Sequence, residues 1–171
     1  MKLTKATLKD IPQLVTLINS AYRGVDSKKG WTTEADLLDG IRTDAGSLKQ
    51  MINKKEAVIL QSFNEYNVLQ GCAYLEKRQH KMYLGMLTVS PFEQAKGLGK
   101  QLLIEDEKYA ADQKCSIIEM TVISVRTELI AWYQKRGYNN TGETKPFPAD
   151  IKFGIPKQPL EFIVMQKEIN L

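Results

Sequence analysis

Apolar positions in the first third of the chain recur every three or four residues, the spacing of amphipathic helices. The first series follows Asp10, a residue type that favours helix N-caps, and comprises Ile11, Leu14, Val15, Ile18 and Ala21. A capping-box pattern at Thr33 and Asp36 predicts a second helix that continues to about residue 43. A third, short helix is predicted at residues 47–53.

Most of the remaining apolar stretches have the length of β-strands and are bounded by turn residues. The predicted strands cover residues 2–6, 57–62, 68–77, 82–89, 116–123, 138–145 and 160–168. Two amphipathic helices, residues 97–113 and 126–136, separate the later strands. A helix that crosses between neighbouring strands implies one parallel pair in an otherwise antiparallel sheet. We therefore predict a mixed α/β (α+β) fold that forms a single domain over residues 1–171.

Composition limits the class of protein. The chain has 171 residues, of which 43% are hydrophobic and 26% charged, as in an ordinary globular domain. No apolar run approaches the roughly 20 residues that cross a bilayer, and the N-terminus lacks the pattern of a secretory signal. Cys72 and Cys115 form neither a disulfide framework nor a metal-ligand spacing. We expect a cytoplasmic protein with no membrane partner and no metal.

The net charge of +4 is spread along the chain without a block of like charges. Such a balance suits a ligand with several phosphates as well as it suits a nucleic acid. Binding to nucleic acid rests on this mild charge alone and predicts salt-sensitive association. We expect no nucleic-acid partner.

The most informative segment is the turn between the strand that ends at Val89 and the next helix. It reads Gln94, Ala95, Lys96, Gly97, Leu98, Gly99 and Lys100. The first amides of a helix have no internal partners, and the helix dipole adds positive charge there. Gly97 and Gly99 lack side chains that would hold a phosphate away from these amides. A bare Gly-x-Gly usually marks only a tight turn, but the full Gln-x-x-Gly-x-Gly spacing is more specific. We predict that this turn binds a pyrophosphate.

This segment resembles motif A of the GNAT family of N-acetyltransferases, whose signature is Arg/Gln-x-x-Gly-x-Gly/Ala. The order of elements resembles that family over nearly the whole chain, most strongly over residues 83–138. The resemblance implies a strongly twisted sheet that is splayed into a V between its fourth and fifth strands, where acetyl-CoA enters. It also implies that backbone groups of Leu87, Thr88 and Val89 hold the pantetheine arm and the thioester, and that residues 94–100 hold the pyrophosphate.

Residues 125–138 resemble motif B of the same family. Tyr133 and Gly137 match the motif, whereas Arg126 stands where asparagine is common, so the cofactor contact of that asparagine is not transferred. The family's matching tyrosine donates a proton to the departing CoA thiolate, which makes Tyr133 the predicted general acid. The alternative is that Tyr133 only packs beside Trp132.

An acceptor amine must lose a proton before or during its attack. For a lysine-like amine this costs about 4 kcal/mol at pH 7, and a general base or a water chain removes the proton. Histone-type members of the family use a glutamate whose position is Tyr83 here, and tyrosine is unsuited to that role. Glu119 and Glu34 are the substitutes. A solvated, outward-facing side chain is an equal alternative for Glu119.

Trp31 and Glu34 lie in the segment that frames the acceptor in this family, so we predict that they bind substrate. Trp31 is equally consistent with an aromatic anchor for its loop. The resemblance implies an enzyme with acetyl-CoA as co-substrate, which transfers acetyl to a primary amine by direct attack in a ternary complex. The alternative is an acyl-CoA-binding or sensing module without turnover, because the fourth-strand carboxylate is missing. The sequence does not identify the amine and leaves open whether the chain forms a homodimer.

Overall fold

A seven-stranded sheet organises the computed structural model, which describes residues 2–94 and 96–171. In spatial order its strands are β1 (Lys2–Lys5), β3 (Ala57–Phe63), β4 (Leu69–Arg78), β5 (Lys81–Val89), β6 (Ile117–Ile123), β9 (Glu161–Glu168) and β7 (Asn139–Pro146). Only β5 and β6 pair in parallel, and the other neighbours are antiparallel. The predicted mixed fold with one parallel pair is confirmed. A separate two-stranded sheet joins β2 (Leu38–Asp39) and β8 (Ile155–Pro156).

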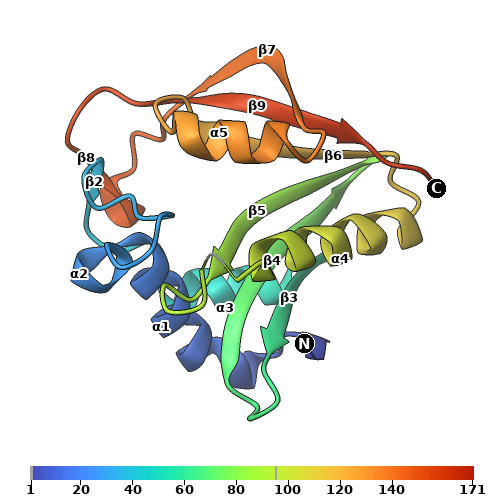
Figure 1. The fold of residues 1–171 in the computed structure, drawn as a ribbon, viewed down its shortest axis with the longest axis horizontal. Helices are drawn as coiled ribbons and strands as arrows, with labels where there is room; N and C mark the ends of the chain where they lie inside the picture. The colour runs from blue at the N-terminus through green and yellow to red at the C-terminus, as the bar shows by residue number, and fades with distance from the viewer. Residues whose placement is uncertain (1, 95) are drawn as a thin grey trace.

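Strands β5 and β6 are hydrogen-bonded to each other only at one end. The paired residues are Lys81–Tyr83 of β5 and Ile117–Glu119 of β6, and beyond them the two strands diverge (Figure 1). In chain order, β5 and β6 are the fourth and fifth strands of the large sheet, so the predicted splay is confirmed. It divides the sheet into a first arm, β1-β3-β4-β5, and a second arm, β6-β9-β7.

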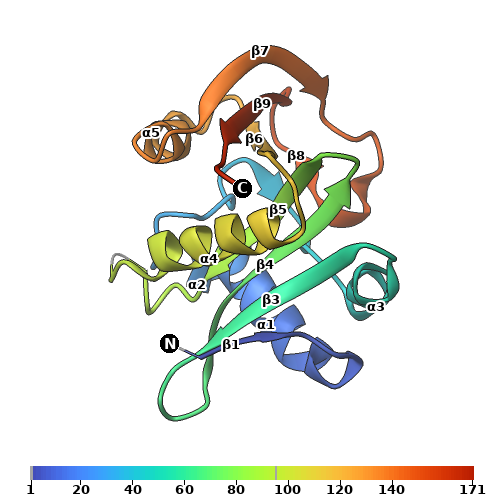
Figure 2. The same ribbon diagram turned by 90° about the vertical axis from the view of Figure 1, so that its right-hand side faces the viewer.

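Helices cover both faces of the first arm. The helices are α1 (Ile11–Tyr22), α2 (Gly24–Ser27), α3 (Ala45–Asn53), α4 (Leu98–Asp112) and α5 (Thr127–Gln134), with 3-10 turns η1 (Leu8–Asp10) and η2 (Ile151–Phe153). α1 and α3 lie on one face of this arm and α4 on the other (Figure 2). α5 lies against the second arm (Figure 1). No helix in the described part of the chain is long and apolar enough to cross a membrane.

The strands of the first arm bury side chains on both faces. In β3, Val58 and Leu60 face the core beneath α4, whereas Ile59 faces the core beneath α1 and α3. This alternation follows from the two-residue period of a strand, and it explains why residues 57–60 of β3 and 71–75 of β4 carry no polar side chain on either face except the Tyr74 hydroxyl. The core beneath α4 continues across the V to Met120 of β6 and Tyr133 of α5, so it joins the two arms.

The second predicted helix, residues 33–43, is wrong: this stretch consists of turns followed by β2. The Thr33 hydroxyl lies 2.7 Å from the Ser27 hydroxyl, and it caps only the amide of residue 35. Glu34 turns inward to pair with Arg23. These distant partners override the local capping pattern. The other predicted helices and strands are confirmed with shifts of a few residues at their ends, while α2, η2 and β8 lie in segments for which no helix or strand was predicted.

Candidate active site

The part of β5 that is not paired with β6 carries a β-bulge. Between Cys72 and Tyr74 one residue of β4 opposes two residues of β5, Met86 and Leu87, and Met86 has a left-handed φ of 55°. The Leu87 carbonyl accepts a hydrogen bond from the Tyr22 hydroxyl of α1. Burial raises the pKa of Tyr22 to about 12, so this hydroxyl remains a donor at neutral pH. The bulge thus takes the backbone at Leu87 out of regular pairing at the point where the V opens.

Two cavities meet at this bulge. The turn cavity, of about 200 Å³, lies at the turn before α4 and includes Gly97 and Lys100. The wide cavity, of about 440 Å³, lies among α1, the loop before β2 and the loop around η2, and includes Glu34. Three residues line both cavities: Leu87, Leu129 and Tyr133. The two cavities therefore adjoin at these three residues.

The two glycines of the predicted phosphate turn differ in surroundings. Gly97 is the N-cap of α4 with a φ of 83°, and a Cβ placed there would meet no atom within 4 Å. A Cβ at Gly99 would lie 3.6 Å from both Trp132 and Val89. Gly97 therefore leaves open space beside the first amides of α4, whereas a Cβ at Gly99 would make ordinary van der Waals contact with α5 and β5.

The other residues of this turn divide by exposure. Lys100 lines the turn cavity. Lys96 is exposed, and its Nζ lies 3.1 Å from Glu93 Oε2. Leu98 is buried in the core. Ala95, which was predicted to offer its amide, lies outside the described residues. Lys100 is thus the lysine of this turn whose side chain reaches the turn cavity.

The side chain of Gln94 fastens the turn to a distant loop. Its Oε1 accepts a hydrogen bond from the Trp31 amide at 2.8 Å, and its Nε2 donates to Thr32 Oγ1 at 2.7 Å and to the Val89 carbonyl at 3.0 Å. From the second arm, buried Arg126 donates to the carbonyls of Thr32 and Trp31 at 3.4 and 3.3 Å. The 31–32 loop is thereby held from both arms, and Arg126 acts as a loop anchor.

Trp31 lines the turn cavity and not the wide cavity, so it lies apart from Glu34, the other residue predicted to bind substrate. The ring centroids of Trp31 and Trp132 are 5.9 Å apart. The guanidinium of Arg136 lies 3.6 Å from the Trp132 ring centroid and also lines the turn cavity. Sequence reasoning missed Arg136, because one basic residue at the end of a helix is ordinary.

Tyr133 is both packed and accessible. Its ring meets Trp132 and Tyr138 edge to face, at centroid distances of 5.0 and 5.7 Å. Its hydroxyl makes no hydrogen bond to any residue that the structure describes. Burial raises the pKa of Tyr133 well above its ordinary value, so the hydroxyl stays protonated at neutral pH. Tyr133 therefore lines both cavities and carries a protonated hydroxyl without a partner among the described residues.

Glu119 lies away from both cavities, at the end of the V where β5 and β6 are still paired. Its Oε2 is 2.9 Å from Lys81 Nζ and accepts a hydrogen bond from Gln166. Burial tends to raise the pKa of Glu119, but the contacts with Lys81 and Gln166 outweigh it and leave the pKa lowered. A carboxylate so paired is a poor base. The prediction of Glu119 as a catalytic residue therefore does not fit its position.

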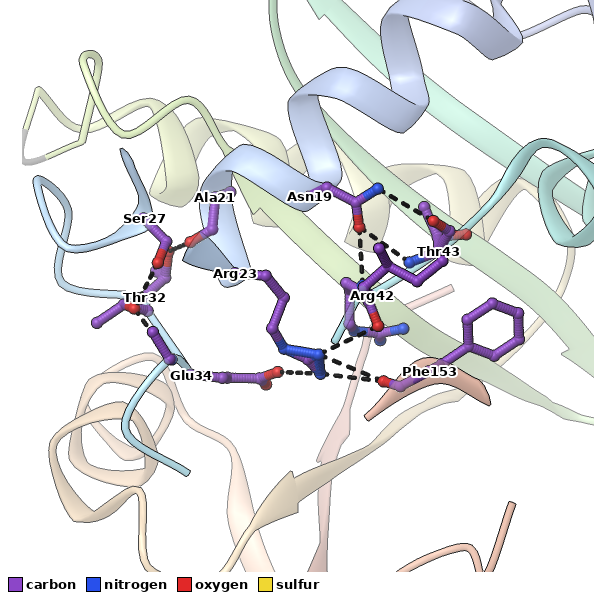
Figure 3. A network of polar contacts seen from close by, with 12 residues as sticks. Asn19, Ala21, Arg23, Ser27, Thr32, Glu34, Arg42, Thr43 and Phe153 are labelled. Carbon is purple, nitrogen blue, oxygen red and sulfur yellow. Dashed lines mark hydrogen bonds and ion pairs between the residues drawn. The ribbon is translucent and has the colours of Figure 1, made fainter. Parts of the chain in front are cut away.

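Glu34 lines the wide cavity, and it lies in a turn rather than in the predicted helix. Its Oε2 lies 3.1 Å from Arg23 Nη2, and this buried guanidinium also donates to the carbonyls of Ile41 and Phe153 (Figure 3). Arg23 thereby joins α1, the loop before β2 and η2, which together wall the wide cavity. The other oxygen of Glu34 has no partner among residues 2–94 and 96–171.

The cysteines offer no nucleophile. Cys72 and Cys115 are both fully buried. Burial raises the pKa of Cys72 to about 12 and also raises the pKa of Cys115, so both stay thiols at neutral pH. Among the described residues, no group of three or more His, Cys, Asp or Glu side chains is arranged to hold a metal ion.

The splayed sheet, with a glycine turn on one side of the opening and a second cavity on the other, defines an acyltransferase type of site. A family model described as an acetyltransferase (GNAT) domain matches residues 38–153. The chain therefore belongs to the GNAT acetyltransferases. No curated protein sequence matches it.

Solved structures support the same fold. The ribosomal-protein-S18-alanine N-acetyltransferase of Escherichia coli aligns with a TM-score of 0.72 and 14% identity, over 99% of this chain and 94% of that protein. A ribosomal-protein-alanine N-acetyltransferase of Brucella melitensis aligns with a TM-score of 0.71 and 20% identity, over 99% and 100%. A GNAT-family acetyltransferase of Staphylococcus aureus aligns with a TM-score of 0.70 and 15% identity, over 99% of each chain.

Proposed function

We propose that this protein transfers an acetyl group from acetyl-CoA to a primary amine by direct attack within a ternary complex. One observation carries the proposal: the turn cavity and the wide cavity converge on Leu87 and Tyr133. A thioester held from one side and an amine held from the other would meet there. Such positioning alone removes a large part of the entropic barrier of a two-substrate reaction.

The residues around the turn cavity fit acetyl-CoA. The amides at the start of α4, beside the open space at Gly97, suit a pyrophosphate, and Lys100 and Arg136 add positive charge. The proposed path of the pantetheine arm follows the backbone of Leu87, Thr88 and Val89. When bound, acetyl-CoA supplies the activated acyl group as a thioester.

The chain's own groups then act on the two reacting ends. Amides near the bulge, at Leu87 and Thr88, are proposed to polarise the thioester carbonyl. Tyr133 is proposed to give its hydroxyl proton to the sulfur as the carbon–sulfur bond breaks. Glu34 is proposed to bind the acceptor's ammonium through the oxygen that has no partner among the described residues. Because Glu34, like Glu119, is paired with a cation, the proton that the amine loses is proposed to leave through a water chain.

A panel of primary amines, incubated with acetyl-CoA and the protein, tests the proposal. We expect release of free CoA together with an N-acetylated product of matching amount, detected by mass spectrometry. Free CoA without acetylated amine would indicate hydrolysis. Tight CoA binding without any transfer would instead support a sensing module, and salt-sensitive binding of DNA or RNA would support the nucleic-acid alternative.

A further inference from the structure

The arginines of this chain divide into two groups. Of its five arginines, three have a carboxylate within 4 Å: Arg23, Arg78 and Arg126. Arg42 and Arg136 have no such partner in the described ranges, and Arg42 lines the wide cavity whereas Arg136 lines the turn cavity. A guanidinium stays charged at any ordinary pH and offers a fork of donors that suits a bidentate anion. Each cavity therefore holds one guanidinium available to the molecule that enters.

Arg42 is held in place before any ligand arrives. The Oδ1 of Asn19 accepts hydrogen bonds from the amides of Arg42 and Thr43 at 2.8 and 3.1 Å, and Asn19 Nδ2 donates to the Thr43 carbonyl at 3.0 Å (Figure 3). The Arg42 guanidinium lies 5.5 Å from the ring centroid of Tyr22. A fixed backbone and a stacked side chain reduce the entropy lost when an anion binds.

The wide cavity also has an apolar wall. Phe147 and Phe162 stack with centroids 5.2 Å apart, and Phe153 adds a third ring. The carboxylate of Glu34, with one oxygen unpaired, faces the same space. A volume of about 440 Å³ is that of a small-molecule site. The cavity thus combines one site for a cation, one for an anion and one for an apolar group.

We infer that the acceptor is a small amine that also carries a carboxylate, an amino acid with an apolar side chain, and that Arg42 binds this carboxylate. The inference rests on the proposed function, because the wide cavity receives the acceptor only if acetyl-CoA occupies the turn cavity. Glu34 then meets the ammonium, and the phenylalanines meet the side chain.

Matched acceptors test the inference. Phenylalanine, phenylalaninamide and phenethylamine share a ring and an amine, but only phenylalanine carries a carboxylate. We expect the wild-type protein to prefer phenylalanine by about 10- to 100-fold in kcat/KM, the usual effect of a hydrogen bond to a charged group. Arg42→Gln should remove this preference through KM, and Arg42→Lys should restore it in part. The aminophosphonate analogue of phenylalanine tests which anion Arg42 binds. A preference for this analogue over phenylalanine would overturn the carboxylate assignment in favour of a phosphate-type group.

The control is Lys108→Gln, which removes one positive charge from the exposed face of α4 and should keep the preference. Equal use of the three acceptors by the wild-type protein, or an unchanged preference in Arg42→Gln, would overturn the inference. Calorimetric titration of phenylalanine and of phenethylamine into the protein with CoA bound compares their affinities. This comparison tests the anion site independently of turnover. If no amine is acetylated but phenylalanine still binds more tightly through Arg42, the proposed function fails while the anion site stands. If calorimetry shows no such preference either, both fail.

Discussion

At the scale of single residues, burial determines which side chains keep their proton. Tyr133 lies in an aromatic cluster with Trp132 and Tyr138, and burial raises its pKa, yet the residue lines both cavities. Asp106 of α4 is wholly buried, and neither of its oxygens has a hydrogen-bond partner in the described part of the chain. Burial raises the pKa of Asp106 well above its ordinary value. Burial thus raises the pKa of one group that lines the cavities, Tyr133, and of another in the core, Asp106.

Tyr133→Phe keeps the ring and its packing but deletes the proton. We expect kcat to fall by about 10²- to 10⁴-fold, the usual contribution of a positioned acid, with little change in CoA affinity. Tyr138→Phe is the matched control, since Tyr138 belongs to the same cluster but lines neither cavity, and should keep kcat near the wild-type value. Single-turnover kinetics with pre-bound acetyl-CoA measures the chemical step. A near-normal rate for Tyr133→Phe would assign Tyr133 to packing alone.

Asp106→Asn should stabilise the fold increasingly as pH rises. The folded-state pKa of Asp106 lies above its unfolded value of about 3.9, so wild-type stability relative to the variant is greatest below that pH and is lost as pH rises toward the folded-state pKa. Over this window the difference in unfolding free energy should grow by up to about 1.4 kcal/mol per pH unit. Urea unfolding at several pH values from 4 upwards measures it. A difference independent of pH would show that Asp106 titrates normally.

At the scale of elements, the sequence pattern predicted the helices and turns that are formed by contacts between neighbouring residues. The apolar periodicity of α1 and the glycine turn before α4 are visible in sequence because neighbouring residues form them. The helix predicted at residues 33–43 fails because Glu34 pairs with Arg23 of α1. Periodicity contains no information on such partners. Sequence reasoning also missed that Gln94 and Arg126 hold the 31–32 loop by hydrogen bonds. It missed the position of Arg42 on the wide cavity for the same reason, because these contacts join residues that are far apart in the chain.

Gly97→Val should weaken CoA binding by more than its effect on stability explains. A side chain at this φ costs roughly 1–2 kcal/mol and would occupy the open space beside the first amides of α4, blocking a phosphate. Gly142→Val is the matched control, with a φ of 84° and open space around its Cβ, but on β7 and outside both cavities. Both variants should lose similar stability in urea. Only Gly97→Val should lose about 10- to 100-fold in CoA affinity by calorimetry. Equal affinities would place the pyrophosphate elsewhere.

At the scale of the whole molecule, the divergence of β5 and β6 has a chemical consequence. Two arms that are paired at one end only leave an opening whose two cavities share Leu87, Leu129 and Tyr133. Under the proposed mechanism, both substrates would be held at once. Cys72 and Cys115 are buried and protonated, so neither can accept the acetyl group in a first, separate step.

This arrangement predicts a kinetic order. If the amine attacks the bound thioester directly, initial rates measured at several fixed concentrations of acetyl-CoA should give double-reciprocal lines that intersect. A covalent acetyl-enzyme would instead give parallel lines, the pattern of a ping-pong mechanism. Intact-protein mass spectrometry after incubation with acetyl-CoA alone should show no gain of an acetyl group. The control is Cys115→Ala, which removes one of the two buried thiols and should keep intersecting lines. Parallel lines together with an acetylated cysteine would contradict direct transfer. They would also mean that the core opens far enough to expose one of the two buried thiols.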